Sequence, residues 1–263
     1  SLLPLYKKWG LKGIKFGFVQ IGNQHWSTWL HDAVRKCAEY EMMVDIHDEY
    51  RPTGFSRTYP NLLTQEGVRG NEEFPDGVNN TTLPFTRFLC GAADATVCYY
   101  HRKELKPGLE KGLNARSLLN TACHQMALSV INYSPLQFLY WYDTPEDVKD
   151  EPEFFFDNLP TTWDDSKTLD GAIGEYITMA RRKDNVWYVG CLTNNDARKL
   201  NVSLDFLEEG KKYELTMFTD GGEKVKTRTH VAIDTKKVTA KTNLKLSLLP
   251  RGGVAMIIKE LKD

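Results

Sequence analysis

Apolar positions follow one pattern in the first part of the chain and another in the last part. Residues 14–19 form an apolar, β-favouring run that predicts a strand buried on both faces, and residues 42–46 predict a second strand. Between them, residues 27–40 show helical spacing of the apolar positions Leu30, Val34, Cys37 and Ala38. A strand, a helix and a strand in succession predict a βα repeat with a parallel sheet.

The middle of the chain combines a long polar segment with two further elements. Residues 51–82 are rich in Gly, Pro, Asn and Thr and are predicted to be one irregular loop. Loops of that length in compact domains are usually functional. Residues 136–142 are predicted to be the last strand of this part. A helix before that strand is predicted from the apolar stripe Cys123, Met126, Ala127, Val130 and Ile131.

The last part of the chain, residues 161–263, is predicted to be an antiparallel β-sandwich. Residues 164–174 are turn-rich and are predicted to be a connection. Strands are predicted in residues 176–180, 186–189, 200–206, 213–217, 244–248 and 254–258. Residues 1–160 hold too few βα units to close a barrel, which needs eight units and typically ~250 residues. They are therefore either an open sheet or the C-terminal portion of something longer.

The composition of the chain argues against several classes of partner and of structural site. The chain has 34 basic and 35 acidic residues, with no Lys/Arg-rich block, so neither nucleic acid nor an anionic membrane is an expected partner. No apolar run is long enough to span a bilayer. The 5 cysteines are odd in number and lack a CxxC pair, which indicates neither a disulfide framework nor a zinc knuckle. They are predicted to be small buried apolar residues.

The densest polar chemistry lies in residues 44–73. His47 and Asp48 end the second predicted strand, and Glu66 and Glu72 follow in the loop. Active sites of parallel α/β folds form where strands end. Several carboxylates together suit a hard cation such as Ca²⁺, and a pair flanking a scissile bond is the minimum equipment for glycoside hydrolysis.

A structural interpretation of the same residues stays open. The three acids can instead form loop salt bridges, because structural ion-pair networks are common. Their partners would be Arg51, Arg57 and Arg69. His47 would then be a hydrogen-bonded structural residue. Gly17, inside a predicted strand, indicates a bulge or the close approach of another group.

A set of longer motifs extends beyond these residues. It comprises His47-Asp48, RPTG (51–54), RTYPN (57–61), Glu66, RGNE (69–72), HQMA (124–127), YSPLQ (133–137), WDD (163–165) and GEY (174–176). These motifs resemble the active-site segment of glycoside hydrolase family 97, and the resemblance covers essentially the whole chain. It implies a bacterial, typically periplasmic, exo-acting α-glucosidase or α-galactosidase. Residues 1–160 would be the second half of a (β/α)8 barrel and residues 161–263 a C-terminal β-sandwich, with the N-terminal remainder of the same protein as partner.

The resemblance also implies roles for single residues. Glu72 matches the general acid, and Asp48 and Glu66 match Ca²⁺ ligands, with Glu72 on or near the ion. Lys15 and His47 match substrate contacts. The remaining calcium ligands would come from the upstream part.

Two positions bear on the mechanism that the resemblance implies. Asp48 stands where retaining α-galactosidases of the family have Asp, but Gly17 stands where they place the Asp nucleophile. The prediction is therefore a retaining α-galactosidase, acting on α-galactoside oligosaccharides, that has lost its nucleophile. One alternative is an inverting α-glucosidase of the same family. Another is a calcium-dependent carbohydrate-binding protein without catalysis.

Overall fold

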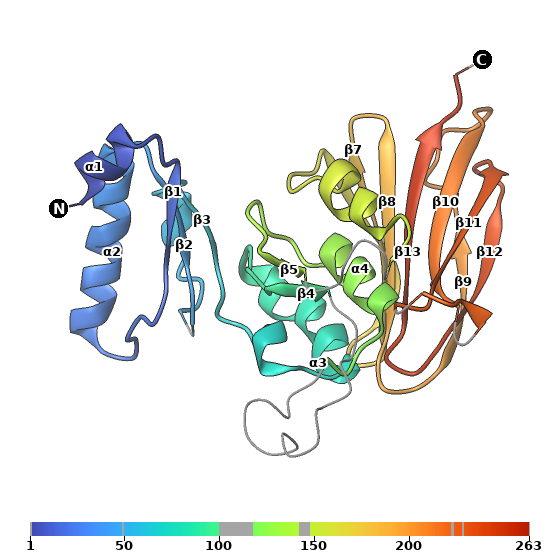
Figure 1. Cartoon of the computed structure of the whole chain (residues 1–263), viewed down its shortest axis with the longest axis horizontal. Helices are drawn as coiled ribbons and strands as arrows, with labels where there is room; N and C mark the ends of the chain where they lie inside the picture. Colours follow the sequence, from blue (N-terminus) through green and yellow to red (C-terminus); the bar gives the residue numbers. More distant parts are fainter. Residues whose placement is uncertain are drawn as a thin grey trace.

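The computed structural model describes residues 2–48, 50–99, 118–141, 148–221, 224–227 and 229–262. A small parallel sheet with its helices lies at one end of the molecule, and a large antiparallel sheet lies at the other (Figure 1). Helix α4 (Ala122–Ile131) lies between the antiparallel sheet and a second pair of parallel strands. No helix in the described ranges is long and apolar enough to cross a membrane.

The predicted βα repeat is confirmed. Strands β1 (Gly13–Phe16), β2 (Met43–Ile46) and β3 (Leu62–Gln65) form a parallel sheet in that order, and α2 (Gln24–Glu39) connects the first two. Leu30, Val34 and Cys37 of α2 pack against this sheet in one apolar cluster, whereas Ala38, also predicted to belong to the stripe, is half-buried and lies outside that cluster. A short helix, α1 (Leu3–Lys8), precedes β1.

Four strands lie where the sequence predicted none, and one of them is β4 (Val97–Tyr99). β3 interrupts the predicted loop 51–82, and β6 (Asp165–Ala172) occupies the predicted connection 164–174. β11 (Val231–Val238) was not predicted at all. β6 and β11 are the two edge strands of their sheet, and most of their residues are exposed or half-buried, so neither carries the apolar alternation of a buried strand. β1 is also half-buried throughout, not buried on both faces as predicted.

The segment after β3 forms short elements before the chain returns to a parallel pair. Strands β4 (Val97–Tyr99) and β5 (Leu139–Trp141) pair in parallel, and Tyr142 of the predicted strand 136–142 lies outside the described residues. The Asp94 N–H donates to the Gln65 carbonyl at 3.3 Å, which joins the approach to β4 to the end of β3. The short helices are η1 (Phe55–Arg57), η2 (Asn71–Glu73), α3 (Gly77–Thr82), η3 (Leu83–Phe85) and η4 (Arg87–Cys90).

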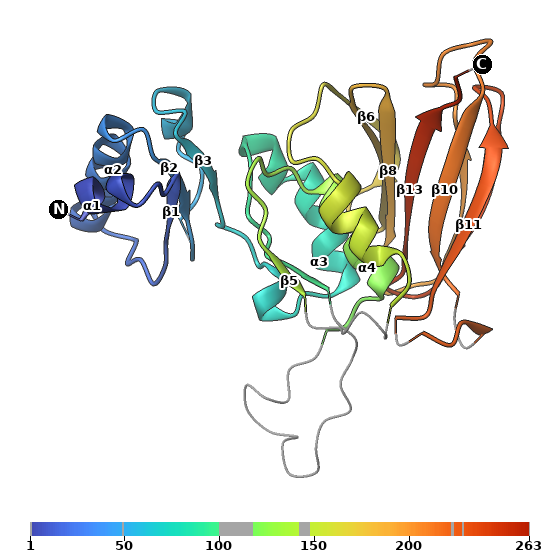
Figure 2. The same cartoon turned by 45° about the horizontal axis from the view of Figure 1, so that its top comes forward.

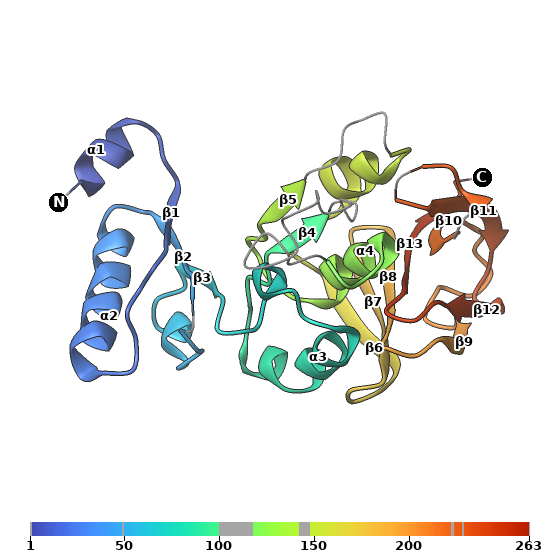
Figure 3. The ribbon, with the colours of Figure 1, turned by 60° about the horizontal axis from the view of Figure 1, so that its bottom comes forward.

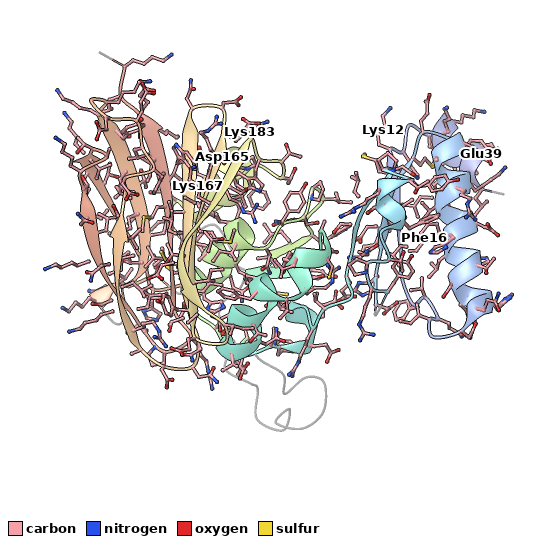
Figure 4. All side chains as sticks on the ribbon, turned by 180° about the vertical axis from the view of Figure 1, so that it is seen from behind. Lys12, Phe16, Glu39, Asp165, Lys167 and Lys183 are labelled. Atoms are coloured by element: carbon pink, nitrogen blue, oxygen red, sulfur yellow. The ribbon has the colours of Figure 1, made fainter. Side chains whose placement is uncertain are left out.

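The large sheet is antiparallel, with the order β11-β10-β13-β8-β7-β6. A two-stranded sheet of β9 and β12 packs on one of its faces, and apolar side chains from both sheets form a shared core, as expected for a β-sandwich. Charged side chains, including Asp165, Lys167 and Lys183, project around β6 and the end of β7 (Figure 4). The remaining bounds are β7 (Tyr176–Lys183), β8 (Val186–Thr193), β9 (Arg198–Ser203), β10 (Tyr213–Asp220), β12 (Asn243–Leu248) and β13 (Gly253–Glu260).

Helix α4 packs on the other face of the large sheet (Figures 2 and 3). The sequence predicted one apolar stripe, but α4 is buried on all sides except at its first residue, because β4 covers it opposite the sheet. Two glycines of the sheet permit this close packing. A Cβ added at Gly190 or Gly253 would lie 2.7 Å from a backbone carbonyl oxygen of α4. The helix η7 (Glu153–Asn158) adds Phe154 and Phe155 to the same core.

The cysteines fit their predicted role with one exception. Cys37, Cys98, Cys123 and Cys191 are buried and free, but Cys90 at the end of η4 is exposed.

Candidate active site

The candidate site begins with the alternation of side chains along β1. Phe16 faces α2, where its ring meets Trp29 edge-on at 5.9 Å between centroids (Figure 4). Successive residues of a strand point to opposite faces, so Lys15 and Gly17 face away from the helix. In the parallel register Lys15 pairs with Asp45, and Asp45 pairs with Thr64. These three positions form one layer of the inner face.

A second layer lies one pleat further along the strands. The His47 N–H donates to the Phe16 carbonyl at 2.8 Å, and the Glu66 N–H donates to the Ile46 carbonyl at 2.8 Å, so the ladder continues past the strand ends. Gly17, His47 and Glu66 therefore occupy this layer together. A Cβ added at Gly17 would meet no atom within 4 Å. A side chain at position 17 would thus enter open space beside His47 and Glu66.

Four of the six predicted site residues, His47, Asp48, Glu66 and Glu72, lie together. The His47 Nδ1 lies 2.9 Å from a Glu66 carboxylate oxygen, and its Nε2 lies 3.7 Å from a Glu72 carboxylate oxygen. Asp48 has a left-handed backbone with φ of 64°, and its Oδ2 accepts a hydrogen bond from the Val19 N–H at 2.8 Å. Ligand atoms of His47, Asp48 and Glu66 all lie within 4.8 Å of one another. Glu72 lies across the imidazole, outside that group of atoms.

The salt-bridge interpretation of these acids is wrong. Among the described residues, Asp48, Glu66 and Glu72 form no ion pair with the three loop arginines, and their close basic neighbour is His47. Instead, the acids line a cavity of about 620 Å³. Its walls also include Arg51, Arg69 and Leu83.

Burial and crowding by other acids control the electrostatics of Glu66. Burial raises its pKa, a hydrogen bond from the Asp48 backbone opposes the change, and the charges of Glu72 and Asp94 raise it again, to about 7. Glu72 is in a wetter place, with 38% of its side chain exposed, and the Tyr140 hydroxyl donates to it at 3.4 Å. Two neighbouring carboxyl groups therefore have different surroundings, which favours different chemical roles.

The donor set fits a divalent cation with oxygen ligands. Asp48 and Glu66 bring carboxylate oxygens together without a cationic side chain between them in the described part of the chain. Ca²⁺ takes 6–8 oxygen ligands, so two or three carboxylates would supply part of its shell. The His47 nitrogen is a poorer donor for such a hard ion, and its Nδ1 already lies 2.9 Å from the Glu66 carboxylate.

Sequence reasoning missed the residues that support the site. Lys15 does not lie in the cavity wall but one layer below it, in contact with the buried acids Asp45 and Asp94. Asp45 could have been noticed as the one charged residue inside an apolar strand. Asn71, next to Glu72, forms a buried two-way amide pair with Gln125 of α4, with N···O distances of 2.9 and 3.3 Å. No local pattern indicates that pair, because its members are 54 positions apart.

The fold and the site define an α/β protein with a carboxylate-lined cavity at the carboxyl end of its parallel strands, followed by an antiparallel β-sandwich. The chain belongs to glycoside hydrolase family 97. Residues 1–68 match the family profile "Glycoside hydrolase 97", and residues 162–259 match the profile "Glycosyl-hydrolase 97 C-terminal, oligomerisation".

Individual relatives agree with this assignment. A retaining alpha-galactosidase of Bacteroides thetaiotaomicron is 36% identical over 97% of this chain and 39% of its own length. A probable retaining alpha-galactosidase of Streptomyces bingchenggensis is 32% identical over 72% of this chain and 28% of its own length. A family 97 enzyme from Pseudoalteromonas, solved with acarbose, superposes with a TM-score of 0.80 at 30% identity over 99% of this chain and 44% of that one. The chain therefore spans about two fifths or less of the curated relatives that it matches.

Proposed function

We propose that this chain is the C-terminal part of a calcium-dependent, exo-acting α-galactosidase of the retaining type, in which Gly17 replaces the nucleophile. The observation that carries the proposal is the inner layer formed by position 17, His47 and Glu66, with open space beside Gly17. The names of the two curated relatives, both retaining alpha-galactosidases, support the choice of substrate and mechanism.

The residues present would supply the general acid of a retaining reaction but not its nucleophile. Glu72, half-exposed at the cavity and hydrogen-bonded by Tyr140, would protonate the glycosidic oxygen as the general acid. His47, whose Nδ1 lies 2.9 Å from Glu66, would contact the sugar. A retaining enzyme needs a second carboxylate to form the glycosyl-enzyme. Because Gly17 offers none, the protein with Gly17 would bind an α-galactoside without cleaving it.

Calcium would be held by Asp48 and Glu66, with Glu72 on or near the ion. Oxygen donors of the two carboxylates already lie within reach of one position. A bound Ca²⁺ would neutralise the acid cluster and polarise a sugar hydroxyl. The rest of its shell would come from water, substrate and the upstream part of the protein.

The proposed architecture places residues 1–160 as the second half of a (β/α)8 barrel, with residues 161–263 as the C-terminal sandwich. Parallel pairing of β1 to β3, the backbone link from Gln65 to Asp94, and the parallel pair β4–β5 support an arc of such a barrel. The N-terminal remainder of the same protein would supply the other strands. A periplasmic location belongs to the same proposal and rests on the family resemblance alone.

Restoring the carboxylate tests the proposal. Gly17→Asp in the full-length protein is expected to create hydrolysis of p-nitrophenyl α-galactoside, with the α-anomer of galactose formed first in proton NMR. Gly17→Asn is the matched control, because it fills the same space without a nucleophile. A Gly17→Asp protein that folds, binds calcium and stays inactive would refute the proposed mechanism.

Two other functions have a specific observation in their favour. The Pseudoalteromonas enzyme solved with acarbose and with panose is 30% and 29% identical, and both compounds are α-glucosides, which favours the α-glucosidase alternative; its inverting mechanism rests on the family resemblance alone. That function predicts cleavage of an α-glucoside by the unchanged protein, with the β-anomer formed first. The glycine at position 17 favours a calcium-dependent carbohydrate-binding protein, which predicts sugar binding but no turnover even after Gly17→Asp.

A further inference from the structure

Beneath the candidate site lies a buried group of three charged side chains from different strands. The Lys15 ammonium on β1 lies 3.3 Å from the Asp45 carboxylate on β2 and donates a hydrogen bond to Asp94, just before β4. Asp45 and Asp94 have side-chain exposures of 0% and 1%, whereas Lys15 keeps 22%. The lysine is thus the only one of the three that reaches accessible space.

The two acids differ in the hydrogen-bond donors that their carboxylate oxygens accept from. Asp94 accepts hydrogen bonds from the backbone N–H groups of Thr96 at 3.1 Å and Phe138 at 3.5 Å, in addition to Lys15. Neither oxygen of Asp45 has a well-directed hydrogen-bond donor among the described residues. A carboxylate that accepts several N–H groups is stabilised in its charged form, whereas a buried one without donors is not.

The net charge of the group is balanced when the two acids share one proton. Two buried carboxylates facing a single ammonium would leave an uncompensated negative charge, which is costly in a dry interior. Burial and the neighbouring Asp94 charge raise the pKa of Asp45 far above its ordinary range. Burial lowers the pKa of Lys15, but its contacts with Asp94 and Asp45 outweigh that effect and the net change is upward. The balanced state is therefore neutral Asp45, charged Asp94 and charged Lys15.

The ammonium keeps donor capacity in this state. Lys has three N–H donors, and at most two of them serve the acids. The Phe138 ring covers another side of the ammonium at 4.0 Å from its centroid, an arrangement that favours the cation. Lys15 keeps 22% of its side chain exposed and lies one layer below Gly17, His47 and Glu66, so a donor that the acids do not use is close to the candidate site.

We propose that Asp45 and Asp94 are a one-proton acid pair that holds Lys15 charged and immobile, so that its free donor binds a hydroxyl group of the sugar. This inference rests on the proposed function, since it assigns the two acids as positioning residues of that sugar site. Glu66 at the end of β3 and His47 at the end of β2 are the other titratable groups on the adjoining layer.

The test uses the absence of turnover in the Gly17 protein, which allows equilibrium binding of p-nitrophenyl α-galactoside to be measured by calorimetry. Asp94→Asn is expected to weaken binding roughly tenfold or more, because Lys15 loses its charged anchor. Asp45→Asn has the same uncharged state as the protonated acid, so it should weaken binding only about two- to threefold. The parent should lose affinity as the pH rises, and Asp45→Asn should not. Lys15→Met should weaken binding at least as much as Asp94→Asn, and the double variant should show no further loss.

Asp220→Asn is the matched control. Asp220 is a half-buried acid of β10 that accepts from Thr121 and from the Gly253 backbone, away from the cavity, so its change should leave the affinity at the parent value. Equal losses in Asp45→Asn and Asp94→Asn, or a parent whose affinity does not fall at alkaline pH, would overturn the acid pair while leaving the proposed function intact. A parent protein that binds no galactoside would instead refute the proposed function. If an Asn variant fails to fold, the pH dependence is measured in Glu66→Gln, which removes the neighbouring carboxyl group whose pKa is raised to about 7; a loss of affinity at alkaline pH that persists there supports the acid pair, and its absence overturns it.

Discussion

His124 of α4 makes the protein sensitive to acid in a way that can be calculated. Its imidazole is fully buried; its Nδ1 lies 3.2 Å from the Gly252 carbonyl, and its Nε2 lies 3.0 Å from the Asn80 side-chain amide. The neutral ring satisfies both contacts, with Nδ1–H donating and Nε2 accepting. A protonated ring would direct N–H at the amide nitrogen of Asn80, so this site disfavours the charged form.

Burial lowers the pKa of His124 from 6.5 to about 4, against hydrogen bonds to Gly252 and Arg251 carbonyls that raise it. As the pH falls below 6.5, the unfolded chain takes up a proton that the folded protein refuses until about pH 4. The contribution of neutral His124 to the free energy of unfolding is therefore fully present above the unfolded-state pKa of 6.5, and it is lost as the pH falls toward the folded-state value of about 4. The loss amounts to about 2 kcal/mol at roughly pH 5 and about 3 kcal/mol once the pH is near the folded value.

The assay compares urea unfolding of the parent and His124→Gln at about pH 7.5 and about pH 5. Glu66, whose raised pKa gives the opposite pH dependence, is present in both proteins and cancels in the difference. The parent should lose about 2 kcal/mol more than the variant between the two pH values. His25→Gln, which removes an exposed imidazole, should behave like the parent. Parallel pH dependence of parent and His124→Gln would refute the reasoning.

Three further predictions concern the metal, the packing of α4 and the support of Glu72. Calcium at 100 times its dissociation constant should stabilise the full-length protein by about 2.7 kcal/mol in thermal unfolding, and Asp48→Asn should abolish that gain. Gly190→Ala should cost about 1–3 kcal/mol, because the new methyl group would lie 2.7 Å from a carbonyl of α4, whereas Gly17→Ala, with open space around it, should cost far less. Gln125→Leu in the Gly17→Asp protein should lower kcat more than it raises KM, because the helical turn that carries Glu72 loses its buried amide partner; unchanged kcat would contradict that role.

How far the fold could be predicted depended on the pattern of burial. The βα repeat and the strands inside the sandwich have clean apolar spacing, and the structure has them where the sequence predicted them, within a few residues. β3 was missed because Thr64 and Gln65 are polar residues inside it, and their side chains are buried all the same. The edge strands β6 and β11 were missed for the opposite reason: most of their side chains meet solvent and need no apolar alternation.

The candidate site was predictable as a set of residues but not as an arrangement. The motifs around His47 and Glu66 identified the segment, and the structure brings Asp48, Glu66 and Glu72 around one imidazole. The support of the site came from residues distant in sequence, because Asp94 is 79 positions from Lys15. Such contacts follow from strand order and register, which local spacing does not contain.

Register also explains why a single glycine matters so much here. A parallel pairing shifted by one residue would turn Lys15 and Gly17 toward α2 and bring Phe16 into the cavity. The observed pairing of Lys15 with Asp45, fixed by the apolar contact of Phe16 with Trp29, puts position 17 in the same layer as His47 and Glu66. Packing against the helix therefore determines which positions in and after β1 face His47 and Glu66. Under the proposed function, replacing one hydrogen at position 17 by a carboxymethyl group is the difference between a protein that binds an α-galactoside and one that cleaves it.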